Sequence, residues 1–325
     1  MSGDPKKSTP ALETRIGPEA AGERVDRWLA ARLERSRSRV HALLDAGMVQ
    51  LGGRTLSRSD KGVALAAGQH VVVRAIELMP EPSDAPLTLA AQGHDWLIAD
   101  KPAGLPVHPL HREQTDTLLN RVVARFPQIV SVGEGGLRSG VVHRLDVPTS
   151  GLVLFALTDA RYHAARDAFL RHTTEKRYFA LVHGHVTQTR RVELDLVVAQ
   201  HRPARVAVVP THETTPHAGV RRCGLGFEPI EHGHRCTLLD VRLETGFLHQ
   251  IRVTLAHLGH PVIGDTVYGR SGERGVRSEE RGVRSEVEAV PPRLMLHAHT
   301  LRVGDAAASS GFPAAFREAM EASHP

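Results

Sequence analysis

Apolar residues recur with helical spacing near the start of the chain. One face of the predicted helix carries four of them, which are Val25, Trp28, Leu29 and Leu33. The neighbouring arginines lie largely on other faces. A second helix follows, with a serine available to cap its start, and Gly47 stands where a helix-ending glycine belongs. Short apolar runs at 48–51 and 69–75 predict strands. The pattern therefore predicts a small α+β module over residues 22–78.

Proline-rich segments flank this module on both sides. Residues 1–21 are polar and contain three prolines, which predicts a flexible tail. Residues 79–87 also contain three prolines and are interpreted as a linker. A second domain is then expected over 88–325.

The second domain mixes strand and helix patterns without regular alternation. Strands are predicted at 96–99, 151–157, 177–183, 237–243 and 294–303. Helices are predicted at 116–125, 159–171 and 248–258. Irregular alternation favours an α+β fold with a largely antiparallel, mixed sheet over a doubly wound fold.

One internal repeat interrupts this domain. The heptapeptide Glu-Arg-Gly-Val-Arg-Ser-Glu occurs at 273–279 and again at 280–286. It is polar and has no apolar face to bury, so we expect a solvated insertion at 271–290 rather than a functional repeat.

The distribution of charge along the chain indicates which class of partner the protein binds. The 325-residue chain has a formal net charge of +5, and residues 22–61 alone hold nine Lys or Arg against five acidic residues. A basic cluster on a small module favours a polyanionic partner such as RNA, although a merely solvated basic face is the alternative.

Several function classes lack their sequence signals. The chain has no phosphate-cradling glycine loop, no paired metal-ligand spacing and no Gly-x-Ser-x-Gly elbow. Its two cysteines cannot form a disulfide framework, and neither a membrane-length apolar run nor an apolar leader is present. We therefore expect a cytoplasmic protein that binds no metal.

The segment 141–152 has the most unusual local composition. Its sequence is Val-Val-His-Arg-Leu-Asp-Val-Pro-Thr-Ser-Gly-Leu, so apolar residues lead a carboxylate, Asp146, into a turn before an apolar strand resumes. The residues alone leave two interpretations open. The polar side chains either satisfy the backbone of the turn, or they present Asp146 for chemistry.

This segment resembles the signature of the RluA family of pseudouridine synthases, which act on large-subunit rRNA and tRNA. The matching residues are His143-Arg144-Leu145-Asp146 with Thr149-Ser150-Gly151-Leu152. Further segments on both sides of it match the family in its order along the chain: Lys101 to Pro109, Thr117 to Asn120, Glu175 to Tyr178, His249 to Val253, Leu258 to Pro261, Gly264-Asp265 with Tyr268-Gly269, and Leu296 to Ala298 with Leu301.

The resemblance implies a catalytic pseudouridine synthase domain that needs no cofactor. It implies Asp146 as nucleophile, acting either on the anomeric carbon of the sugar or through a glycal. Arg252 would pair with Asp146, and Tyr178 would stack on uracil and take or relay a proton. Arg144 would fill the position that the flipped uridine leaves, the alternative being a salt bridge within its loop.

The first module resembles the alpha-L RNA-binding motif, which often precedes this catalytic domain. The matching segments are Arg24 to Leu29, Ser36 to Ser38 and Gly47 to Val49. By this resemblance, five arginines would contact RNA: Arg24, Arg27, Arg35, Arg37 and Arg39.

One departure bears on the substrate. The family's late signature reads Thr-Gly-Arg-Thr-His-Gln-Ile-Arg, whereas Phe247 and Leu248 stand here in place of the Arg and Thr. The expected partner is RNA, with rRNA favoured over tRNA, and we expect a monomer with no DNA or membrane partner. A non-catalytic RNA-binding protein and a nucleoside glycosidase are the alternatives from other classes.

Overall fold

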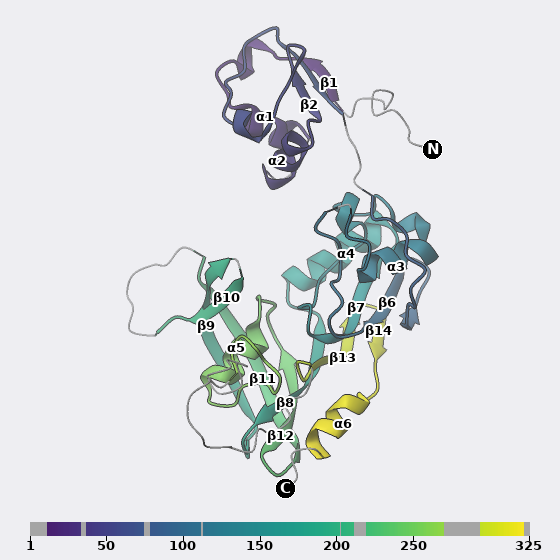
Figure 1. The fold of residues 1–325 in the computed structure, drawn as a ribbon, viewed down its shortest axis with the longest axis vertical. Coiled ribbons are helices and arrows are strands. Elements are labelled where there is room, and N and C mark those ends of the chain that lie inside the picture. Colours follow the sequence, from purple (N-terminus) through teal and green to yellow (C-terminus); the bar gives the residue numbers. More distant parts are fainter. Residues whose placement is uncertain are drawn as a thin grey trace, which may run out of the picture. The chain divides into compact units, whose positions relative to one another are not determined.

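A computed structural model shows two compact units, Met1–Leu78 and Met79–Pro325 (Figure 1). The residues that the structure describes are 12–33, 37–74, 79–111, 113–201, 203–210, 219–269 and 293–321. The predicted insertion at 271–290 lies outside them. Within them, no helix has the length and apolar character needed to span a membrane.

The first unit packs two helices, α1 (Val25–Arg32) and α2 (Arg37–Asp45), on a small antiparallel sheet. The strand order is β1-β4-β2-β3, with bounds Leu12–Arg15, His70–Val73, Val49–Leu51 and Arg54–Thr55. The predicted helical face is buried, because Val25 and Leu29 contact the sheet core together with Val40 and Leu44 of α2. The module expected from the apolar pattern is therefore a folded α+β unit.

The predicted tail needs correction. Residues Leu12–Arg15 form β1, which pairs along its whole length with β4. Ile16, 2% exposed, belongs to the core of the unit. The prolines suggested an unstructured segment, but the alternation of half-buried and exposed residues over 12–15 matches an edge strand.

The second unit is built on a ten-stranded sheet whose main path runs β10-β9-β11-β12-β8-β13-β7-β6-β5, with β14 paired to β13. The strands are β5 Leu89–Gln92, β6 Trp96–Lys101, β7 Ser150–Ala156, β8 Glu175–His183, β9 Arg190–His201, β10 Ala204–Val208, β11 Arg221–His232, β12 Cys236–Leu243, β13 Leu296–Val303 and β14 Ala306–Ser309. Only the pair β13–β7 is parallel among the described pairs. The predicted α+β class with a largely antiparallel, mixed sheet is confirmed.

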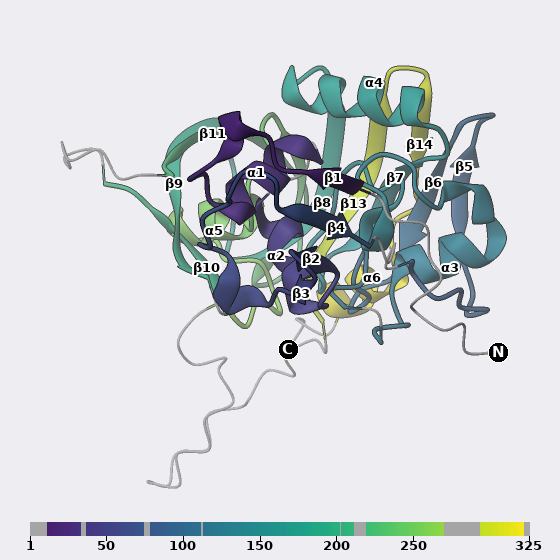
Figure 2. The same ribbon diagram turned by 90° about the horizontal axis from the view of Figure 1, so that it is seen from above.

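Helices cover both faces of this sheet. They are α3 (Leu118–Arg125), α4 (Asp159–Leu170), α5 (Gln250–His257) and α6 (Ala314–Glu321). In β7, Val153 and Phe155 join the core shared with α3, α5 and α6, whereas Leu152 and Leu154 join the core under α4. Figure 2 shows α4 on one side of the sheet, with α3 and α6 on the other. Burial on both faces explains why β7 is a continuous apolar run.

The predicted linker is packed against the second unit. The Ser83 N–H donates to the Asn120 carbonyl at 3.0 Å, and the Asn120 side chain donates to the Glu81 carbonyl at 2.6 Å. Leu87 packs on the main core. Prolines make this stretch extended, but its remaining polar groups and Leu87 fix it to α3 rather than leaving it as a free spacer.

Candidate active site

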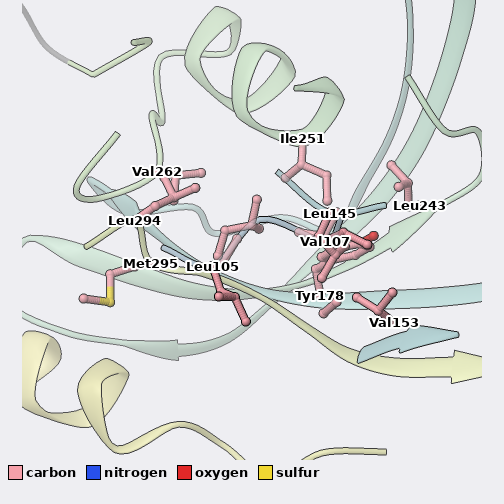
Figure 3. Packing of buried hydrophobic residues seen from close by; sticks show 14 of the residues in the cluster. Leu105, Val107, Leu145, Val153, Tyr178, Leu243, Ile251, Val262, Leu294 and Met295 are labelled. Atoms are coloured by element: carbon pink, nitrogen blue, oxygen red, sulfur yellow. The ribbon is translucent and has the colours of Figure 1, made fainter. Parts of the chain in front are cut away.

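Asp146 lies on a loop that the core holds in place. Leu145, which precedes it, is 8% exposed and packs beneath Ile251 of α5, close to Val107 and Tyr178 (Figure 3). The Thr149 N–H donates to the Asp146 carbonyl at 3.1 Å, which closes the turn before β7. With its neighbour buried and its backbone in a turn, the Asp146 side chain remains 20% exposed and lines a cleft.

A buried lysine fastens this loop to another. The Lys101 ammonium donates to three carbonyl oxygens, those of Pro102 at 3.0 Å, Leu105 at 2.7 Å and Val147 at 3.0 Å. Burial lowers the pKa of Lys101 to about 7, although the charge of Asp146 opposes that shift. Lys101 therefore uses all three of its donors to hold the backbone next to Asp146.

Arg252 on α5 is the direct partner of Asp146. Its Nη1 lies 3.1 Å from Asp146 Oδ2, and its Nε and Nη2 bind Asp265 at 2.7 and 2.8 Å. The guanidinium is 4% exposed. Burial opposes its charge, but Asp265 and Asp146 together raise the pKa of Arg252. A permanently charged, two-sided clamp therefore fixes the Asp146 carboxylate.

Asp265 lies in one of the matching segments, although the sequence alone assigns it no role. Besides Arg252, its Oδ1 accepts the N–H groups of Val267 at 2.9 Å and Tyr268 at 3.0 Å. Burial opposes its ionisation, but Arg252 lowers the pKa of Asp265. Gly264 before it has φ +76°, and a Cβ there would lie 2.1 Å from the Arg293 carbonyl oxygen. The Gly-Asp pair is thus required by backbone geometry as well as by charge.

His249 approaches Asp146 from the start of α5. Its Nε2 lies 3.8 Å from Asp146 Oδ2, and its Nδ1 lies 2.9 Å from the Tyr268 hydroxyl. Because that hydroxyl already accepts the Val206 N–H at 2.8 Å, its own proton is available for Nδ1. In neutral His249 the ring proton then sits on Nε2, facing the carboxylate. Burial lowers the pKa of His249, so the neutral form is favoured.

Tyr178 enters the same cleft from β8. It is 8% exposed and lies between Val241 of β12 and Ala298 of β13 in the sheet. Burial and the charge of Asp146 raise the pKa of its phenol. The ring is thus held rigidly by the sheet, and its hydroxyl stays protonated at neutral pH.

The two basic residues of the signature have different environments. Arg144 is exposed and forms no ion pair with a described residue, so the salt-bridge alternative finds no support in that part of the chain. His143 stacks on Phe169 with a 4.8 Å centroid distance, and its Nε2 accepts the Leu154 N–H at 3.0 Å. Burial lowers the pKa of His143 to about 3, which makes it a neutral structural residue.

These groups surround one cleft of about 1110 Å³ in the second unit. All four site residues predicted for this unit line it: Arg144, Asp146, Tyr178 and Arg252. Phe247 and Leu248 line it too, and both pack on the small apolar cluster that contains Val253. The departure from the family signature therefore replaces polar groups of the cleft wall with apolar ones.

In the first unit, two of the five predicted RNA-binding arginines pair with one buried acid, Asp26. Arg24 donates to both Asp26 oxygens at 3.0 Å, and Arg37 lies 3.6 Å from the same carboxylate. Arg27 is exposed. Arg35 and the side chain of Arg39 lie outside the described residues.

Metal ligands are not assembled anywhere in the described ranges. No group of three or more His, Cys, Asp or Glu side chains in those ranges could hold an ion. Cys223 and Cys236, both in the described ranges, are buried and form no disulfide.

Comparison with known proteins identifies one family. Residues 95–257 match the family model described as RNA pseudouridylate synthase. An uncharacterized RNA pseudouridine synthase of Synechocystis is 31% identical, over 92% of this chain and 86% of the relative. The ribosomal large subunit pseudouridine synthase D of Zymomonas mobilis is 32% identical, over 81% and 82%. Among solved structures, the human RNA pseudouridylate synthase domain containing 4 shares the fold, with a TM-score of 0.56 at 18% identity, covering 72% of this chain and 92% of that one.

The family model and the relatives cover the segment that carries Asp146, Tyr178 and Arg252, and the sheet has the same fold as the solved synthase domains. This chain therefore belongs to the RNA pseudouridylate synthase family, as an isomerase of the RluA type.

Proposed function

We propose that this enzyme isomerises uridine in large-subunit rRNA, with Asp146 as the nucleophile. The observation that carries the proposal is the clamp formed by Arg252, which joins Asp146 to the buried Asp265 at the wall of the cleft. A carboxylate that is fixed in place and partly exposed is suited to a sugar with developing positive charge.

The reaction needs only bonds within the nucleotide. The glycosidic bond from uracil N1 to the ribose breaks, the base turns, and uracil C5 bonds to the same sugar carbon. The proton leaves C5 and N1 gains one, so atoms and electrons balance without a co-reactant. Asp146 either adds to the anomeric carbon or removes a sugar proton on a glycal route, and both roles require a carboxylate oxygen that Arg252 holds in place.

Tyr178 is proposed as the stacking surface for the detached base. Its raised pKa disfavours a phenolate, so it acts as a proton relay only by giving up one proton as it receives another. Arg144, exposed at the cleft, is proposed to occupy the stack that the flipped uridine leaves.

The alternatives from other classes are weakened by particular contacts. A glycosidase would need a second working carboxylate. Asp265 cannot serve because Arg252 and two backbone N–H groups occupy it and it is 2% exposed. The other carboxylate that lines the cleft, Glu134, is paired with Arg138 at 3.2 Å. A non-catalytic RNA-binding protein would not need the assembled set of Asp146, Tyr178 and Arg252. Large-subunit rRNA is favoured because relatives bear that name and the first unit adds a basic surface.

The experiment is carbodiimide mapping of pseudouridine in RNA from cells that lack this protein. We expect a missing modification in large-subunit rRNA that the wild-type chain restores and Asp146→Asn does not. A modification missing only from tRNA would redirect the substrate, and restoration by Asp146→Asn would overturn the proposed nucleophile.

A further inference from the structure

Lys176 is a buried cation of the cleft that the catalytic set leaves unused. It is 6% exposed and lies on β8 two residues before Tyr178, so the two side chains share one face of the strand, with their Cα atoms about 7 Å apart. Both line the cleft. Arg177 between them points to the other face, where it pairs with Asp240 at 2.6 Å and Glu228 at 3.0 Å.

Among the described residues, the protein offers few hydrogen-bond acceptors to the Lys176 ammonium. Among the described residues it has one hydrogen-bond acceptor, the Thr245 carbonyl at 3.3 Å, and the Phe169 ring centre lies 5.8 Å away. Across the same ranges, no carboxylate forms an ion pair with Lys176. An ammonium has three N–H donors, so the cleft side of this group is left for a ligand.

The other buried lysine shows what a purely structural role looks like. Lys101 gives all three donors to protein carbonyls and does not line the cleft. Both lysines are desolvated, and burial lowers the pKa of Lys176 to about 8. A cation held in this way without an anionic partner is unfavourable until a ligand supplies the negative charge.

The cleft indicates which ligand this is. Its lining includes seven Arg or Lys side chains and two carboxylates, so it attracts an anion. The ribose that Asp146 faces carries a phosphate on each side, and the strand spacing puts Lys176 beside the base that Tyr178 stacks on. We propose that Lys176 binds a backbone phosphate of the RNA strand next to the target uridine. This inference rests on the proposed function of the same cleft.

The test measures RNA binding rather than turnover. Full-length Lys176→Met and Lys176→Arg are made in the Asp146→Asn background and titrated with the rRNA fragment that contains the mapped uridine. Losing a hydrogen-bonded charge should weaken binding about ten- to a hundredfold for Lys176→Met, and Lys176→Arg should recover most of it. Arg177→Met is the matched control, because it removes a neighbouring cation that faces away from the cleft.

A chemical substitution in the RNA makes the test independent of folding. Neutral methylphosphonate linkages are placed one at a time around the target uridine. One flanking linkage should weaken binding by the Asp146→Asn protein by the same factor as Lys176→Met, and the two changes together should add little more. A Lys176→Met effect that is equal at every linkage would overturn the proposal and point to a uracil carbonyl instead. Unchanged binding by Lys176→Met, or no sensitive linkage when Lys176 is intact, would also overturn it.

The experiment distinguishes a failure of the phosphate site from a failure of the proposed nucleophile. If Asp146→Asn turned over RNA, the nucleophile would be wrong, while the phosphate contact would still be measured as binding. If Asp146→Asn is inert and no linkage is sensitive, the phosphate site alone is wrong.

Discussion

The two units of this chain use arginine and aspartate in opposite arrangements. In the first unit the acid is buried: Asp26 has no exposed side-chain area, whereas its partners Arg24 and Arg37 are 49% and 64% exposed. In the second unit the cation is buried: Arg252 is 4% exposed and holds Asp146 and Asp265 on either side. The first arrangement directs positive charge to solvent, and the second directs one carboxylate into a cleft.

Because the arginines are exposed in the first unit and buried in the second, their interactions differ in their sensitivity to salt. Exposed arginines act over the Debye length, about 8 Å at physiological salt, and their attraction for phosphates is screened. A buried, bidentate pair is much less sensitive to salt and fixes geometry instead. Changes in the first unit should therefore alter RNA affinity, and changes in the second should alter chemistry.

The largest effect is expected from Arg252→Met. It leaves Asp146 without its partner and Asp265 buried without a counter-charge, and losing one member of such a pair costs about 3–5 kcal/mol. Turnover should fall by orders of magnitude. Because a dry site favours protonation of the unpaired carboxylates, part of the activity should return as the pH rises. Single-turnover rates against pH measure this, and a rate near wild type at neutral pH would show that Arg252 does not support Asp146.

Asp265→Asn should have a smaller effect on the same clamp. It keeps the size of the side chain and the Arg252–Asp146 contact, but it removes the charge that anchors the guanidinium from the other side. We expect turnover intermediate between wild type and Arg252→Met, with RNA affinity unchanged. Rapid-quench kinetics beside RNA titrations check this. Weakened affinity with full turnover would contradict the assignment of Asp265 to positioning.

A third prediction concerns the acid stability of the first unit. Hydrogen bonding from Arg24 lowers the pKa of Asp26 to about 2, against 3.8 for an ordinary Asp. A carboxyl group whose pKa is lower in the folded state than in the unfolded state stabilises the fold at pH values above the unfolded pKa. This contribution should therefore disappear as the pH falls from about 4 towards 2. The chain has two tryptophans, so Trp96→Phe leaves Trp28 to report on the first unit alone.

In that background, Asp26→Asn should lower the denaturant midpoint of the Trp28 transition at neutral pH and flatten its acid dependence. Turnover at saturating RNA should be retained. An acid profile that is the same with and without Asp26 would show that this carboxylate does not organise the unit.

The smallest effect is expected from Arg27→Gln combined with Arg37→Gln. Each arginine–phosphate interaction that the substitutions remove should lower the slope of log affinity against log salt by roughly one. Chemistry at saturating RNA should not change. Arg302→Gln, an exposed arginine of β13 in the second unit, is the control. A slope equal to wild type would mean that the basic cluster is only a solvated face.

The local pattern of apolar residues predicted much of the fold. It did not predict strands whose formation depends on pairing with other strands. The strand predicted at 151–157 is Ser150–Ala156, because burial on both faces makes it apolar throughout. By contrast, β9 and β11 were not predicted. Most of their residues are exposed or half-buried, and β11 contains Gly224 and Gly226, so neither composition nor alternation marks them. They exist because they pair with each other and β11 with β12.

The candidate site also contains residues whose roles the sequence predicted and residues whose roles it did not. Asp146, Tyr178 and Arg252 were predicted from motifs similar to those of a family, and the structure brings them to one cleft. The roles of Lys101 and Asp265 were not predicted. Lys101 holds the carbonyl of Val147, which is 46 residues away, and Asp265 acts on Asp146 only through Arg252, which reaches that carboxylate across 106 residues. Only the tertiary fold shows that one lysine braces the loop and one aspartate anchors the clamp.

In the proposed mechanism, Asp146, held by Arg252, performs the isomerisation. The most direct measurement uses purified protein and RNA with tritium on uracil C5, because forming the new carbon bond releases that tritium to water. Wild type should release it, whereas Asp146→Asn should bind the RNA with nearly unchanged affinity and release none in a single turnover. Release by Asp146→Asn at a rate within about tenfold of wild type would contradict the account.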